Sequence, residues 1–179
     1  AFYCALLNNW PMGFYHPATL VKDAERHGVA LRPIDVMQSA WRCTIEEGGL
    51  RIGLRYVSGL REDVGRRIEE ERRRAPFATL ADLVARAALQ EDERRRLAFA
   101  GACAAFGGRR RDVLWQMAAL DPRSTTLFGN VGSRSFGTER TSPLPAMSPL
   151  EETVADYAST GLTIGPHVMA HLRAALRKQ

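Results

Sequence analysis

A chain of 179 residues, 45% hydrophobic and 25% charged, is long enough to fold around a core as one ordinary domain or two small ones. Its 25 basic and 20 acidic residues give a net charge of +5, which permits a nucleic-acid partner without requiring one. The sequence has no run of about 18 apolar residues and no basic N-terminal segment with a cleavage-type end, so we expect neither a membrane span nor a secretory signal.

Almost all of the basic residues are Arg, since Lys22 and Lys178 are the only Lys residues. Planar guanidinium groups suit phosphate and carboxylate partners, but a GC-rich coding bias explains the preference equally well. The three cysteines, Cys4, Cys43 and Cys103, lie far apart, and we expect buried, reduced thiols in a cytoplasmic protein. The chain does not begin with Met, and we expect it to be part of a longer protein.

Residues 1–55 are predicted to form a small mixed α/β part. Pro17 suits the first turn of a helix that ends at Gly28. Short extended pieces are expected at residues 29–31 and 34–36, followed by a strand, a turn and a strand within residues 41–54.

Residues 56–120 are predicted to be helical, with helices over 61–74, 91–100 and 109–120 and another that begins after the N-cap Thr79. Tight glycine joints between short helices are typical of helical hairpins. The expected fold class is therefore mainly α, with a small mixed α/β N-terminal part and a tandem helix-hairpin-helix module.

The rest of the chain divides into a linker and a helical end. Residues 121–147 are rich in Pro, Gly, Ser and Thr, which predicts a flexible linker. Residues 148–179 are predicted to form C-terminal helices, because Ser148, Pro149 and Glu151 make a strong helix start and Gly161 a stop. A final amphipathic helix is expected over residues 166–177.

The sharpest motif lies at residues 56–68, where an apolar pair, a glycine and an apolar residue precede a helix, the helix-hairpin-helix pattern. A glycine at the hairpin allows close approach to a phosphate, and the free N–H groups of the next helix start point at that anion. Such hairpins hold the sugar-phosphate backbone and read no sequence. The predicted DNA-binding residues here are Ser58, Gly59, Leu60, Arg61, Glu62, Arg66 and Arg67.

Arg61 stands where the pattern usually has a second glycine, so it either adds a phosphate-binding cation or disrupts the backbone cradle. An ordinary helical hairpin that packs only for stability is the alternative interpretation of the whole motif.

A second predicted contact follows from glycines and arginines between two later helices. Three cations at a helix start oppose the helix dipole, which favours a nearby anion, although a solvated charge run explains them equally well. The residues are Gly101, Gly107, Gly108, Arg109, Arg110 and Arg111. The charge runs at residues 61–74 and 91–96 are otherwise expected to pair at i,i+4 on a solvated surface.

No catalytic residue and no metal site is predicted. His167 and His171 have the spacing of half a zinc site but lack partners, and no set of carboxylates suits two metal ions. No cofactor is therefore expected for this chain.

Taken together, these segments resemble bacterial C-family DNA polymerases of the DNA polymerase III alpha type, most closely the error-prone, damage-inducible variant. The resemblance begins in Phe2–Tyr15, which is similar to the end of the fingers domain, and it keeps the same order through the chain. The further matching segments are residues 23–29, 33–36, 53–60, 76–83, 100–102, 107–110 and 156–162.

The resemblance implies a segment that grips duplex DNA non-specifically in an enzyme of translesion synthesis and induced mutagenesis. In that family, palm aspartates hold two metal ions, so Mg²⁺ is expected for the parent polymerase, but none of these aspartates maps onto this chain. The family's phosphoesterase-like domain and OB-fold are not represented either, and His167–Val168 replaces a usual His-Pro before the OB-fold. The segment alone should be inactive.

The resemblance also bears on protein partners. Leu127 and Phe128 retain part of the family's sliding-clamp motif, whose Gln is lost, so clamp binding is expected to be weak or indirect. Accessory mutagenesis proteins are expected partners, and a module that mainly docks such factors is the alternative function. A stand-alone structural domain is a third possibility.

Overall fold

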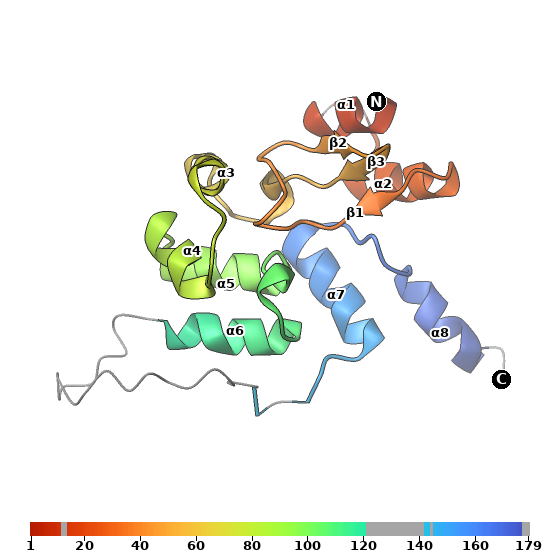
Figure 1. Ribbon diagram of the computed structural model, residues 1–179. Coiled ribbons are helices and arrows are strands. Elements are labelled where there is room, and N and C mark those ends of the chain that lie inside the picture. The colour runs from red at the N-terminus through yellow and green to blue at the C-terminus, as the bar shows by residue number, and fades with distance from the viewer. Residues whose placement is uncertain (12–13, 121–141, 144, 177–179) are drawn as a thin grey trace, which may run out of the picture.

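The computed structural model describes residues 1–11, 14–120, 142–143 and 145–176 (Figure 1). Its first part combines two helices with three short strands: α1 (Phe2–Asn8), α2 (Pro17–Arg26), β1 (Leu31–Arg32), β2 (Thr44–Glu46) and β3 (Gly49–Arg51). Pro17 occupies the first turn of α2, and Gly28 follows the helix with a φ of +74°. The predicted start and stop of this helix are therefore confirmed.

Strand β3 is the centre of the small sheet. It pairs with β1 in parallel, with Leu31 opposite Leu50, and with β2 in antiparallel, with Ile45 opposite Leu50. The turn between β2 and β3 has positive φ at Glu47 (+49°) and Gly48 (+76°), the geometry that two-residue hairpins prefer. The predicted strand–turn–strand is confirmed.

Both strands of this hairpin are shorter than predicted. At Gly53 the backbone packs directly against the backbone of residues 41–43, because a Cβ there would lie 2.5 Å from the carbonyl oxygen of Trp41. The chain then turns into a 3₁₀ helix, η1 (Leu54–Tyr56). Residues 34–36 form no strand, because the Asp35 side chain accepts a hydrogen bond from the backbone N–H of Met37 (2.8 Å) and starts a turn.

The remaining described elements are helical: α3 (Glu62–Arg74), α4 (Leu80–Arg86), α5 (Glu91–Phe99), the 3₁₀ helix η2 (Ala104–Phe106), α6 (Arg110–Ala119), α7 (Pro149–Thr160) and α8 (Val168–Leu176). In Figure 1, α5 and α6 lie side by side and α7 packs against α5. The expected fold class, mainly α with a small mixed part, is confirmed.

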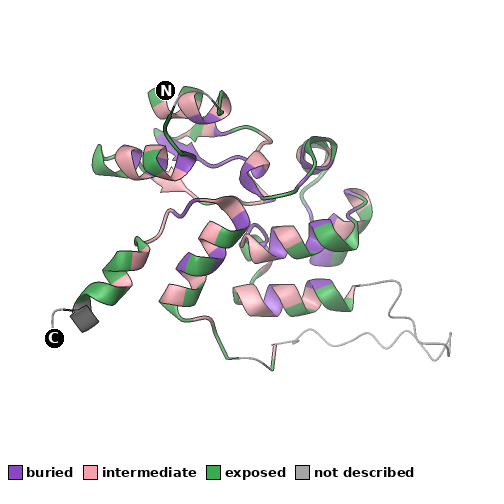
Figure 2. Ribbon diagram, turned by 180° about the vertical axis from the view of Figure 1, so that it is seen from behind, coloured by how far each residue is buried: buried purple, intermediate pink, exposed green. Residues whose placement is uncertain are grey.

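One core joins the mixed part to the helical part. Its fully buried members include Leu7, Leu54, Leu83 and Leu97, which come from both sides of residue 55. Figure 2 shows buried ribbon in both parts of the chain. A backbone hydrogen bond from Val36 N to Ala102 O (2.8 Å) also links the two parts. The mixed part therefore packs against the helical part and supports the hairpins rather than standing apart from them (Figure 1).

Candidate nucleic-acid interface

The first hairpin connects η1 to α3. Val57 and Leu60 face the core, and the N–H of Leu60 donates to the carbonyl of Val57 (3.0 Å), which closes a tight turn. Gly59 lies at the tip with a φ of +73°, a conformation that favours glycine. The buried Val57 and Leu60 fix the turn to the core, so its outer backbone and the start of α3 face outward together.

Gly59 also makes room for a side chain that the sequence did not single out. The guanidinium of Arg96, on α5, lies against Gly59, and a Cβ at residue 59 would be 2.0 Å from its Nη1 atom. The same nitrogen donates to the carbonyl of Ser58 (3.0 Å). Arg96 is therefore the cation that lies nearest to the hairpin tip among the contacts described for Gly59.

The N-terminus of α3 is open to a ligand. Its N-cap residue, Arg61, provides no side-chain cap, and no other described residue caps it, whereas Thr79 and Ser148 cap α4 and α7. The N–H of Ser58 is already committed, since it donates to Ser159 O at the end of α7 (2.8 Å). The backbone N–H groups that remain available to a ligand are thus those at the start of α3.

The predicted cations of this hairpin are paired; Arg61 and Arg66 are exposed, and Arg67 is partly exposed and also donates to the carbonyl of Ala87 (3.2 Å). Arg61 donates to Glu93 on α5 (2.9 Å) and lies 3.7 Å from Asp63; the hydrogen bond to Glu93, the charge of Glu93 and that of Asp63 raise the pKa of Arg61. Arg66 pairs with Glu62 and Arg67 lies 3.8 Å from Asp63, both at i,i+4. Exposed pairs of this kind contribute little to stability, so their cations can exchange a carboxylate for a phosphate.

The second hairpin repeats one feature of the first. Gly101 has a φ of +72°, and the guanidinium of Arg110 lies against it, with Nη2 2.9 Å from where a Cβ would be. Arg110 is only 11% exposed in its side chain and pairs with Asp156 on α7 (2.6 Å). It therefore joins α6 to α7.

Of the other two predicted arginines, Arg111 is ion-paired, whereas Arg109 has no ion-pair partner among the described residues. Arg111 pairs with Glu151 (3.0 Å) and donates to the carbonyls of Pro145 and Ala146. Arg109 is exposed and has no ion-pair partner within the described part of the chain. Only Arg109 of the three is thus placed to meet an anion without breaking an existing pair.

The joint before α6 consists of the predicted glycines Gly107 and Gly108, with φ values of +81° and +87°. The carboxylate of Asp112 lies at this helix start and accepts hydrogen bonds from Arg109 N (2.9 Å) and Ser142 N (2.8 Å). These bonds lower the pKa of Asp112. An internal carboxylate therefore already occupies the N-terminus of α6, unlike that of α3.

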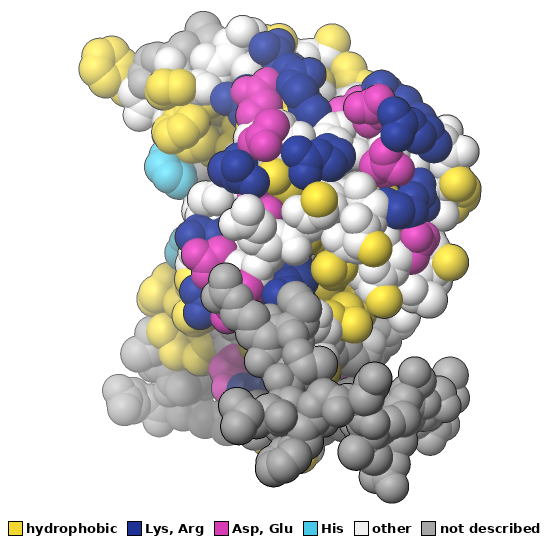
Figure 3. All heavy atoms as spheres, turned by 90° about the vertical axis from the view of Figure 1, so that its left-hand side faces the viewer, with side chains coloured by type: hydrophobic (Ala, Val, Ile, Leu, Met, Phe, Trp, Pro, Cys, Tyr) yellow, Lys and Arg dark blue, Asp and Glu magenta, His cyan; other side chains and the backbone are white. Residues whose placement is uncertain are grey.

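The face seen in Figure 3 carries basic side chains beside acidic ones rather than a continuous basic patch. This pattern matches the i,i+4 pairs along α3, which include Arg73 with Glu69 and Arg74 with Glu70. The expected pairing of the charge run at residues 61–74 is confirmed.

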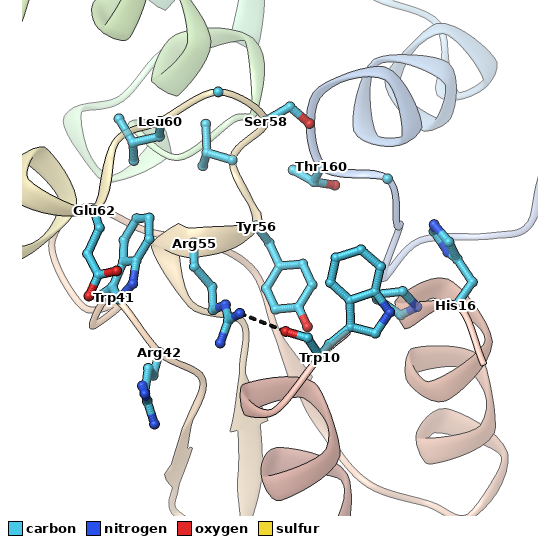
Figure 4. Close-up of a pocket in the computed structure, with 14 residues that line it drawn as sticks. Trp10, His16, Trp41, Arg42, Arg55, Tyr56, Ser58, Leu60, Glu62 and Thr160 are labelled. Carbon is cyan, nitrogen blue, oxygen red and sulfur yellow. Dashed lines mark hydrogen bonds between the residues drawn. The ribbon is translucent and has the colours of Figure 1, made fainter. Parts of the chain in front are cut away.

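A pocket of about 490 Å³ lies beside the first hairpin, and sequence reasoning did not predict it (Figure 4). Ser58, Gly59 and Leu60 form one side. Most of the other walls come from the N-terminal part and η1. Glu62 at the start of α3 and Thr160 and Gly161 at the end of α7 complete the pocket. The lining from the N-terminal part and η1 includes Trp10, His16, Trp41, Arg42, Arg55 and Tyr56. Single aromatic residues scattered over 47 positions give no sequence signal, because only the fold brings them together.

No three His, Cys, Asp or Glu side chains among the residues that the structure describes could together hold a metal ion. No described helix is long and apolar enough to cross a bilayer. Leu127 and Phe128, predicted as a degenerate clamp motif, lie outside the described residues.

Comparison with known proteins adds an independent observation. A family model described as a helix-hairpin-helix motif matches residues 28–113. This range contains both hairpins, the small sheet and helices α3 to α5, so it confirms the motif predicted from the hairpin sequence.

Curated relatives match the chain along almost its full length. The error-prone DNA polymerase of Azoarcus sp. strain BH72 is 44% identical over 188 aligned residues, which cover 99% of this chain. Those of Pseudomonas aeruginosa strain PAO1 and Pseudomonas savastanoi pv. phaseolicola are 42% and 41% identical over 99% and 98% of it. The chain spans only 17% to 18% of the length of these relatives.

Proposed function

We propose that this chain, which is similar to a part of error-prone DNA polymerases, holds duplex DNA by its sugar-phosphate backbone. The observation that carries the proposal is the helix-hairpin-helix motif whose first hairpin leads into α3, a helix start without a side-chain cap. Uncapped N–H groups and the helix dipole together attract an anion such as a phosphate.

The charges around this helix start support the same role. Arg61, Arg66 and Arg67 provide three cations, while Glu62 and Asp63 provide two carboxylates that these cations already contact. A phosphate that approaches the helix start would be held by the cations, with the first-turn carboxylates limiting affinity. We therefore expect moderate, sequence-independent binding that depends on salt.

The parent protein is proposed to be a DNA-directed DNA polymerase of translesion synthesis, with accessory mutagenesis proteins as partners. Two-metal chemistry would be the source of nucleotide transfer in such an enzyme. The described residues provide no ligand set for those metal ions, so no chemical step is assigned to them. Their part is to bind and orient the duplex.

Titration of duplex DNA against salt tests the proposal. The double variant Arg66→Glu with Arg67→Glu should weaken binding and reduce the slope of log K against log salt by about 2, because each lost phosphate contact removes about one unit. The matched control is Arg73→Glu with Arg74→Glu, an identical charge change at the other end of α3.

Three results would contradict the proposal: no binding, binding that is independent of salt, or an equal loss in both double variants. If DNA binding is absent while accessory proteins bind both the chain and its Arg66→Glu, Arg67→Glu variant, then docking of accessory proteins would replace DNA binding as the proposed function.

A further inference from the structure

The pocket beside the first hairpin combines aromatic and cationic side chains (Figure 4). Its volume of about 490 Å³ falls within the range of about 300–1,000 Å³ that is typical of small-ligand sites. Because Ser58, Gly59 and Leu60 form its rim, whatever enters it lies next to the backbone that the first hairpin would hold. The pocket is thus continuous with the proposed DNA contact.

Trp10 is held in place yet remains open to a ligand. Arg55 donates to the carbonyls of Asn8 (2.6 Å) and Trp10 (3.0 Å), which fixes the backbone that carries the indole. The ring meets His16 edge-on, with centroids 6.4 Å apart and an interplanar angle of 70°. Trp10 is nevertheless 37% exposed, so its contact with His16 leaves part of the indole free for another planar group.

Trp41 forms the opposite wall and is positioned by α3. A Cβ at Gly65 would lie 2.3 Å from Cε3 of Trp41, so the ring rests directly on the helix backbone. The backbone N–H of Trp41 also donates to Glu69 on the same helix (3.1 Å). This wall therefore moves with α3, whose N-terminus is the proposed phosphate contact.

The charges that line the pocket favour an anionic ligand. Arg42 is exposed and has no ion-pair partner in the described ranges, and Arg55 is partly exposed. The carboxylate among the lining residues, Glu62, already accepts a hydrogen bond from Arg66 (2.7 Å). An aromatic platform beside unpaired guanidinium charge is the chemistry that recognises unpaired nucleotides, which stack their bases and present a phosphate.

We propose that this pocket takes one unpaired nucleotide of a DNA strand that leaves the duplex held by the first hairpin. Its base stacks on Trp10, and its phosphate meets Arg42. This inference rests on the proposed function, because the duplex must lie on the hairpin for its strand to enter the adjacent pocket.

The test compares a blunt duplex with the same duplex carrying an unpaired extension of about four nucleotides. Fluorescence anisotropy with the full chain should give at least about fivefold tighter binding of the extended duplex, the low end of what one stacked base contributes. Trp10→Ala should abolish this preference and leave blunt-duplex binding unchanged, while Trp10→Phe should keep it. Trp115→Ala is the matched control, since Trp115 is an exposed indole on α6 outside the pocket.

A second readout follows the base itself. 2-Aminopurine at the first unpaired position should lose emission when the chain binds and should recover it in Trp10→Ala. Arg42→Ala should also reduce the preference for the extended duplex, and this surface variant keeps the test decisive should Trp10→Ala fail to fold.

The outcomes separate the inference from the proposed function. Salt-dependent binding of both duplexes with equal affinity, or an equal loss for both in Trp10→Ala, would overturn the pocket assignment alone. Absence of binding to either duplex would overturn both.

Discussion

Gly59 and Gly101 each place an arginine side chain against a left-handed backbone. Arg96 lies on Gly59, and Arg110 lies on Gly101. The glycines therefore serve a purpose besides the one that the motif suggests: they leave space for a guanidinium from a later helix, α5 at Gly59 and α6 at Gly101. At Gly59, that guanidinium also brings a positive charge to the hairpin tip.

This arrangement predicts the cost of adding one methyl group. Gly59→Ala should lower the free energy of unfolding by about 1–3 kcal/mol, because it adds a clash with Arg96 to the strain of a positive φ. Gly28→Ala is the control, since Gly28 has nearly the same φ (+74°) and nothing within 4 Å of the added Cβ. Urea unfolding of both variants measures the difference.

A double variant isolates the clash. Arg96→Ala should reduce the cost of Gly59→Ala to that of Gly28→Ala, because only the backbone strain then remains. If Gly59→Ala and Gly28→Ala lowered the free energy of unfolding equally with Arg96 present, the Arg96 side chain would move away from the added methyl group without a measurable loss of stability.

Helices α5, α6 and α7 begin with the same device. A carboxylate at the third helical position accepts a hydrogen bond from the N-cap N–H: Glu93 from residue 90 (3.0 Å), Asp112 from residue 109 (2.9 Å) and Glu151 from residue 148 (2.7 Å). These bonds are the largest contribution to the lowered pKa of Asp112 and of Glu151. Negative charge at a helix start also suits the helix dipole.

The lowered pKa values predict a dependence of stability on pH. The unfolded chain binds protons at Asp112 and Glu151 more readily than the folded chain does, so the stabilisation is complete above their ordinary pKa values of 3.8 and 4.5. It is lost as the pH falls through the lower values of the folded state. Unfolding free energies measured in urea from about pH 6 to pH 3 should fall less in Asp112→Asn and Glu151→Gln than in the unmodified chain.

The control for this series is Glu91→Gln, because Glu91 is an exposed first-turn carboxylate of α5 without a hydrogen bond from any described residue. If Glu91→Gln reduced the fall of the unfolding free energy with pH as much as Asp112→Asn and Glu151→Gln do, the effect would come from general charge and not from these caps.

Element starts were predictable where the signal is local. Ser148, Pro149 and Glu151 gave the start of α7 correctly, because capping depends on four consecutive residues. The partners of Arg61 and Arg110 were not predictable, since Glu93 and Asp156 lie 32 and 46 residues away. Arg110 and Arg111, predicted to contact DNA, instead pair with Asp156 and Glu151 and so join α6 to α7. Sequence spacing alone does not distinguish an arginine that joins helices from one that binds DNA.

The whole molecule shares one core across residue 55, where the sequence predicted a boundary. Cys43 lies in the mixed part and Cys103 in the second hairpin, and both belong to this core. Burial raises the pKa of Cys43 to about 11 and that of Cys103 to about 12. Both thiols are therefore unreactive in the folded chain, because the thiolate is the nucleophile.

Thiol labelling in increasing urea tests whether the core unfolds as one unit. With single-cysteine variants, Cys43 and Cys103 should become reactive at the same urea concentration, whereas Cys4, which is only partly buried, should react earlier. Reaction of Cys43 well before Cys103 would indicate two units that unfold separately.

Helix α7 touches both hairpins: Ser58 N bonds to Ser159 O at the first, and Arg110 bonds to Asp156 at the second. Because α7 contacts both hairpins, it sets the distance between the two candidate DNA contacts. The spacing of those contacts along a duplex is therefore fixed by a helix that follows both hairpins in the chain, so a small rotation of α7 would shift both hairpins relative to the phosphates at once.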